Sequence, residues 1–112
     1  MEIKALSIKE PWASMIARGE KTIETRTKKT NHRGPLLICA TKKPAIENAG
    51  HAVALVWLVD CRPMTKDDEE AACCPYEEGR YAWVLENVTP IRPYPVKGKQ
   101  GIFTVDLPSK KG

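Results

Sequence analysis

The feature that most constrains the fold is a near-continuous apolar run from His51 to Cys61, in a chain of only 112 residues. A segment that is apolar at almost every position is typical of a strand buried on both faces. Its uninterrupted part, from Ala52 to Val59, is too short to cross a bilayer, which needs about 20 residues. We therefore expect a central strand with Trp57 in the core of a small soluble, cytoplasmic protein without a membrane segment.

Shorter segments predict further strands around this one. Alternating or apolar patterns mark residues 4–8, 22–27, 36–41, 81–88 and 102–107. Pro90, Pro93 and Pro95 are expected to break the strand that starts at Tyr81. About five or six strands with two or three short helices predict a mixed α+β, mainly β fold that closes as a small barrel. We expect one domain over residues 1–108 and a short polar tail at 109–112.

Two helices are expected between the strands. Glu10-Pro11 is a typical helix start, and Gly19 a typical left-handed end. The second helix, within Pro63–Cys74, has Thr65 as its N-cap and an acidic first turn at residues 67–70. This acidic turn leaves open that the chain is a protein-interaction module.

The charges of the chain are unevenly distributed. Residues 1–43 hold ten Lys or Arg against four Asp or Glu, residues 44–80 hold three against eight, and residues 81–112 hold five against two. If the two basic ends meet in the fold, they form a positive face that attracts phosphates. The four cysteines have no CxxC spacing and no nearby histidine pair, so we expect reduced thiols, no metal and no cofactor.

The segment Gly19–Arg26 contains the densest group of ionisable side chains. Glu24 and Arg26 are two residues apart on an expected strand, so they share a face and can form an ion pair. Lys21 lies in the preceding turn, where strand periodicity does not fix its direction. Held in a partly dry cleft, its amine could serve as a base or nucleophile. The other reading, an ordinary surface ion pair, is equally compatible with the sequence.

Other polar and aromatic residues could line the same cleft. Lys97 and Lys99 flank a glycine in a loop that suits phosphates, although it is not a Walker A motif. Tyr81 and Trp83 share a strand face and could stack on bases or lie in the core. Single polar groups at strand ends or loops add Ser7, Arg33 and Lys42.

These motifs together resemble the ASCH (activating signal cointegrator homology) domain family, whose hallmark is G-x-K-x-x-E-x-R. The resembling segments are residues 7–13, 19–26, 33–34, 40–42, 81–83 and 96–101. The resemblance implies a PUA-like β-barrel with a ligand cleft between the barrel and the first helix, where Pro11 and Trp12 are candidate ligand-binding residues. ASCH domains are proposed to bind RNA, so it implies an RNA, nucleotide or nucleoside ligand and is compatible with a monomer.

The resemblance also implies an alternative activity. Small ASCH proteins of similar size act as amidohydrolases on N4-acetylcytidine, with the hallmark lysine, a threonine three residues later and a further glutamate. Lys21 matches the lysine, Glu24 stands where those enzymes carry threonine, and Glu86 is one candidate for the later acid. Lys21 and Glu24 are therefore the candidate catalytic pair, and the resemblance favours binding more firmly than hydrolysis.

Overall fold

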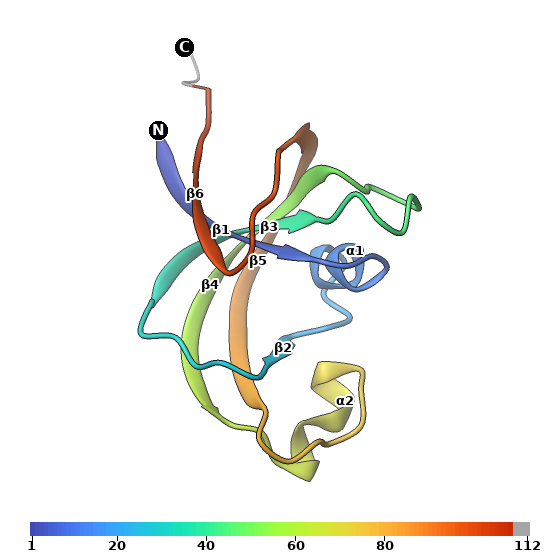
Figure 1. The fold of residues 1–112 in the computed structure, drawn as a ribbon, viewed down its shortest axis with the longest axis vertical. Coiled ribbons are helices and arrows are strands. Elements are labelled where there is room, and N and C mark those ends of the chain that lie inside the picture. Colours follow the sequence, from blue (N-terminus) through green and yellow to red (C-terminus); the bar gives the residue numbers. More distant parts are fainter. Residues whose placement is uncertain (109–112) are drawn as a thin grey trace.

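One curled sheet of six strands forms the frame of the molecule (Figure 1). The computed structural model describes residues 1–108, and the expected tail at 109–112 lies outside them. The strands are β1 (Glu2–Ile8), β2 (Ile23–Arg26), β3 (Gly34–Ala40), β4 (His51–Pro63), β5 (Tyr81–Pro95) and β6 (Ile102–Asp106). Their order is β2-β5-β4-β3-β1-β6, and only β1 and β3 are parallel. The sheet is a half-barrel, which confirms the predicted mainly β, PUA-like fold.

The two longest strands, β4 and β5, give the sheet its curl. Their pairing shifts register between Ala52 and Ala54, between Leu55 and Trp57, and between Leu58 and Asp60. Each such irregularity bends a strand and increases its twist. The sheet therefore wraps around one side of the molecule instead of lying flat.

The predicted end of β5 at Val88 is wrong. The strand continues through Pro90, Pro93 and Pro95, and Pro95 still pairs with His51 of β4. The short strand β2 pairs with β5 only as far as Val84, so within residues 1–108 the later part of β5 has β4 as its single neighbour. A proline lacks the N–H of a ladder hydrogen bond, and an edge position does not need one.

The main hydrophobic cluster packs helix α1 (Trp12–Ala17) against one face of the sheet. Ala13 and Ile16 of α1 meet Leu6, Leu36 and other apolar side chains there. A second cluster covers part of the other face; its buried members are Ala5, Leu37, Cys39, Ala52, Phe103 and Val105.

The expectation that Trp57 lies in the core is wrong, since its side chain is 45% exposed. Its neighbours across the sheet, Pro35 and Glu86, are exposed as well. They occupy a part of the second face that the second cluster does not reach. The apolar run His51–Cys61 is therefore fully covered on one face only.

The helices are short and lie on the same side of the sheet, with β2 between them (Figure 1). Helix α1 begins after Pro11, and Gly19 follows it with φ +78°, as the sequence predicts. The predicted helix within Pro63–Cys74 is a 3-10 turn, η1 (Lys66–Asp68), followed by α2 (Glu69–Ala72). Thr65 is the N-cap of η1, as expected.

The start of β1 and the end of β6 lie side by side (Figure 1). The amino group of Met1 contacts Asp106 Oδ1 at 3.2 Å and the Leu107 carbonyl at 2.9 Å, and the Leu107 N–H donates to the Met1 carbonyl. Within residues 1–108, no helix is long and apolar enough to cross a membrane.

Candidate functional site

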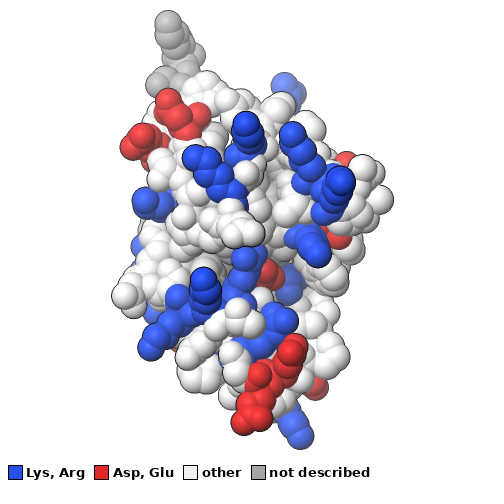
Figure 2. Space-filling model, viewed as in Figure 1, with Lys and Arg blue, Asp and Glu red and all other residues white. Residues whose placement is uncertain are grey.

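A cleft of about 1300 Å³ opens between α1, the segment 74–80 and the loop 96–101, over the ends of β1, β2 and β3. Figure 2 shows a hollow across the middle of this face, with Lys and Arg side chains gathered on both sides of it. The basic residues that line the cleft are Lys9, Lys21, Arg26, Lys28, Lys42, Arg80, Lys97 and Lys99, and the acidic ones are Glu24 and Glu77. The lining is thus richer in cations than the whole chain.

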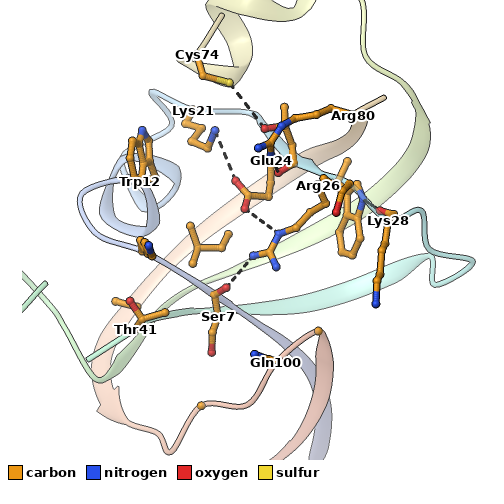
Figure 3. Close-up of a pocket in the computed structure, with 18 of the residues that line it drawn as sticks. Ser7, Trp12, Lys21, Glu24, Arg26, Lys28, Thr41, Cys74, Arg80 and Gln100 are labelled. Carbon is orange, nitrogen blue, oxygen red and sulfur yellow. Dashed lines mark hydrogen bonds and ion pairs between the residues drawn. The ribbon is translucent and has the colours of Figure 1, made fainter. Parts of the chain in front are cut away.

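Three side chains from the segment Gly19–Arg26 form a line of charges on the cleft floor (Figure 3). Glu24 Oε1 lies 3.6 Å from Lys21 Nζ, and Glu24 Oε2 accepts a hydrogen bond of 3.0 Å from Arg26 Nε. Lys21 is 3% exposed and Glu24 9% exposed, and Lys21 Nζ also donates to the Ala72 carbonyl. The carboxylate is therefore held between two cations in a place with little water.

Local structure explains how these three charges converge. Glu24 and Arg26 lie on one face of β2 because side chains alternate along a strand. Lys21 lies in the turn after α1, where its N–H donates to the Met15 carbonyl, and the next N–H, of Thr22, donates to the Ala71 carbonyl. These bonds tie the turn to both helices, and they fix the direction that strand periodicity leaves open.

The far side of Arg26 joins the charge line to the rest of the cleft. Its Nη2 donates to the Ser7 carbonyl at 2.8 Å, and its guanidinium lies 6.0 Å from the centre of the Trp83 ring. At this separation a cation is attracted to the face of an indole. Trp83 is itself held by a 3.0 Å hydrogen bond from Nε1 to the Lys28 carbonyl. Residues of three strands, β1, β2 and β5, therefore hold the cleft floor in place.

Most residues predicted for the site lie together. Nine line the cleft: Ser7, Trp12, Lys21, Glu24, Arg26, Lys42, Trp83, Lys97 and Lys99. Three lie outside it. Pro11 is the N-cap of α1, Tyr81 packs against the main cluster, and Arg33 donates to the carbonyls of Thr30 and His32 on an exposed loop. Glu86 is exposed on β5 and does not line the cleft.

Several lining residues are not predicted from the sequence. The segment after α2 supplies Cys74, Tyr76 and Arg80, the residues after β1 and β3 add Lys9 and Thr41, and the loop 96–101 adds Gln100. Figure 3 shows Cys74 and Arg80 above Glu24, and Thr41 and Gln100 on the opposite side, near Ser7. The preceding residues 67–70 are acidic and give no indication that the segment after them lines a cleft. The one local indication is the basic Arg80 beside Gly79.

The acidic stretch itself is partly used inside the molecule. Asp68 is buried and receives two hydrogen bonds of 2.8 Å from the Arg62 guanidinium. These bonds, with a further one from the Thr65 N–H, lower the pKa of Asp68 to about 2 against the opposing effect of its burial. Asp67, Glu69 and Glu70 remain exposed.

The cysteines and the acids do not form a metal centre in the described part of the chain. No group of three or more His, Cys, Asp or Glu side chains in residues 1–108 is placed to hold an ion. All four cysteines are free thiols. Burial raises the pKa of Cys39 to about 12, so this thiol stays protonated at neutral pH. Cys74 is half-buried, with Sγ 3.8 Å from Thr25 Oγ1 at the cleft wall.

A PUA-like half-barrel with a charged cleft beside its first helix defines the class of this molecule. The chain belongs to the ASCH domain family, whose match covers residues 6–95. Among curated proteins it is similar to activating signal cointegrator 1 of Homo sapiens and of Mus musculus, with 27% and 26% identity over 96% of this chain. The chain spans 23% of the length of these relatives.

Solved structures show the same fold. The ASCH protein of Zymomonas mobilis superposes with a TM-score of 0.74 at 17% identity, over 92% of this chain and 87% of that chain. A structure of its S128A mutant gives a TM-score of 0.68 at 16% identity, over the same shares of the two chains. At these identities the similarity concerns the fold of the polypeptide.

Proposed function

We propose that this ASCH domain binds RNA or a nucleotide-like ligand in the cleft between the half-barrel and α1. The observation that carries the proposal is the floor Lys21-Glu24-Arg26 beneath a lining with eight basic and two acidic residues. Cations at a cleft rim contact phosphates. A carboxylate that cations already hold in place can accept a hydrogen bond from a base amine without rearrangement.

An exposed indole supports a ligand with an aromatic ring. Trp12 lines the cleft and is 40% exposed, although a large apolar side chain gains by burial. Figure 3 shows its ring on the opposite side of Glu24 from Arg26. A base that enters between Trp12 and Arg26 has the indole ring on one side and the charged residues of the cleft floor below it. Stacking of this kind is worth about 1–3 kcal/mol per base.

Binding of short RNAs, measured by fluorescence anisotropy across a salt series, tests the proposal. We expect affinity to fall as salt rises and to weaken in Lys21→Met, which retains most of the side-chain volume. A melting curve confirms that the variant is folded. Affinity that is independent of salt and unchanged in this variant would refute the proposal. Lys66→Ala is the matched control, since Lys66 is exposed on η1 and does not line the cleft.

A second candidate function is hydrolysis of the amide of an acylated cytidine. It is favoured by the buried amine of Lys21 next to the Glu24 carboxylate at the cleft floor. In this role Lys21 acts as base or nucleophile, and Glu24 transfers protons. N4-acetylcytidine and water would give cytidine and acetate. Incubation of folded protein with N4-acetylcytidine tests this, and the absence of cytidine would eliminate this substrate.

A further inference from the structure

We propose that the loop of residues 96–101 is the phosphate-binding element of the cleft. Its ligand is then a phosphorylated nucleoside, either a free 5′-mononucleotide or a nucleotide unit within RNA. The inference rests on the proposed function, and it adds where the phosphate is held and which groups hold it.

The backbone of this loop is available to an anion. Val96 is fixed by a 3.0 Å hydrogen bond from its N–H to the Gly50 carbonyl. Beyond it, the N–H groups of residues 97–101 have no acceptor within residues 1–108, and the segment is exposed. Successive free N–H groups in a loop are a common means of binding phosphate oxygens. Lys97 and Lys99 add two charges to the same short segment.

The loop lies directly on Ser7. The Ser7 Oγ is buried without a hydrogen-bond partner in the described part of the chain. A Cβ atom built on Gly98 would lie 2.5 Å from this Oγ and 3.6 Å from the Ser7 Cβ. Because the first separation is a clash, a side chain at position 98 would force either the loop or the Ser7 hydroxyl to move.

The Ser7 hydroxyl, which has no hydrogen-bond partner in residues 1–108, can take one from a bound phosphate. Buried hydroxyl groups normally have a partner. Ser7 Oγ lies beneath a loop whose own N–H groups are free, so a phosphate held by those groups would lie next to a hydroxyl that can donate to it. The same phosphate would be close to the point where Arg26 donates to the Ser7 carbonyl.

The arrangement divides the cleft into two parts. Figure 3 shows Ser7, Thr41 and Gln100 on one side and Lys21, Glu24 and Arg80 on the other, with Arg26 reaching between them. Lys9 and Lys42 add cations at the ends of β1 and β3 on the side of Ser7. A nucleotide fits this division with its phosphate at the loop and its base at Glu24.

Titration with inorganic phosphate, followed by amide NMR signals, tests the loop directly. We expect saturable shifts concentrated at residues 96–101 and at Ser7, and a loss of affinity of about 10-fold or more in Lys97→Ala/Lys99→Ala. The matched control is Lys4→Ala/Lys66→Ala, which removes the same charge outside the cleft. Equal shifts around lysines over the whole surface, or equal losses in both double variants, would overturn the proposal.

The contact between Gly98 and Ser7 gives a second test that does not depend on charge. Gly98→Ala should displace the loop or turn the Ser7 hydroxyl away from it, and either change should weaken phosphate binding by about 5-fold or more. Ser7→Ala/Gly98→Ala removes the clashing oxygen and leaves an ordinary 3.6 Å contact, so its affinity should return to that of Ser7→Ala. Melting curves of each variant report folding. A folded Gly98→Ala that binds phosphate normally would contradict the proposal.

Ligand comparisons distinguish the source of the phosphate. We expect a nucleoside 5′-monophosphate to bind about 10-fold or more tightly than its nucleoside, and Lys97→Ala/Lys99→Ala to abolish the difference. Tighter binding of an oligoribonucleotide without terminal phosphates identifies RNA as the source. If RNA still binds but a phosphate group gives no gain in affinity, this inference is refuted while the proposed function stands. Phosphate binding at the loop without any RNA or nucleotide binding supports the loop as an anion site and refutes the proposed function.

Discussion

Replacing Glu24 by glutamine removes the negative charge from the middle of the cleft floor. The shape of the side chain is retained, and the amide oxygen can still accept from Arg26 Nε. Lys21, at 3% exposure, loses the only carboxylate within ion-pair distance of it in residues 1–108 and keeps the Ala72 carbonyl. A buried cation is then left without its counter-charge.

The structure allows the cost of this change to be estimated. Removing one partner of a fully buried ion pair costs about 3–5 kcal/mol. The Arg26 side chain is partly exposed, keeps its hydrogen bond to the Ser7 carbonyl and can still donate to the amide oxygen, so its share of the loss is smaller. We therefore expect Glu24→Gln to lower the free energy of unfolding by about 2–4 kcal/mol, a large part of the 5–15 kcal/mol typical of a domain.

Urea denaturation at pH 7 measures this loss, and the chain provides a matched control. Glu77 Oε2 lies 3.0 Å from Arg80 Nε, the same distance as in the Glu24–Arg26 pair, but the Glu77 side chain is 67% exposed. Glu77→Gln should therefore cost less than about 1 kcal/mol. If the two variants lose the same small amount of stability, the floor is as well solvated as the surface, and the reasoning from burial is wrong.

Three further predictions follow from residues described above. Trp12→Ala should weaken the binding of short RNAs by about 5-fold or more in anisotropy measurements, because it removes the indole that lines the cleft, and a melting curve of the variant reports the stability lost with the buried part of the side chain. Asp68→Asn should lower the free energy of unfolding by about 1–2 kcal/mol at pH 7. This is less than the full pKa shift implies, because solvent screens the partly exposed Arg62. Because the folded-state pKa of Asp68 is about 2 and its ordinary value 3.8, this contribution is complete above about pH 4 and is lost as pH falls toward 2, which denaturation at several pH values measures. With the pKa of its buried thiol raised to about 12, Cys39 should resist alkylation at pH 8 until urea unfolds the protein, while Cys61, Cys73 and Cys74 react in the folded state, as mass spectrometry would show.

Local periodicity accounts for what the sequence predicts correctly. The two-residue spacing of Glu24 and Arg26 places them on one face of β2, and Gly19 ends α1 because it accepts a positive φ. Such features depend on neighbours a few residues away, so they can be read along the chain. The family resemblance adds the PUA-like barrel and the position of the cleft beside the first helix.

The remaining features depend on contacts between distant segments. Trp57 is apolar within an apolar run, but the second cluster, to which Phe103 and Val105 of β6 contribute, does not extend over the sheet face around it. The prolines of β5 are tolerated because β2 is too short to pair beside them. The contact of Gly98 with Ser7 joins residues 91 positions apart, and no local pattern indicates it.

The adjacent ends of β1 and β6 have a consequence for how the domain can be joined to other polypeptides. Met1 contacts Asp106 and Leu107 at one end of the sheet, whereas Ser7, in the cleft, lies six residues further along β1. At about 3.3 Å per residue this separation is about 20 Å. Chains attached at the two ends would therefore leave through one place without crossing the cleft mouth. The architecture suits insertion into a loop of a larger protein, or a circular permutation that links the two ends.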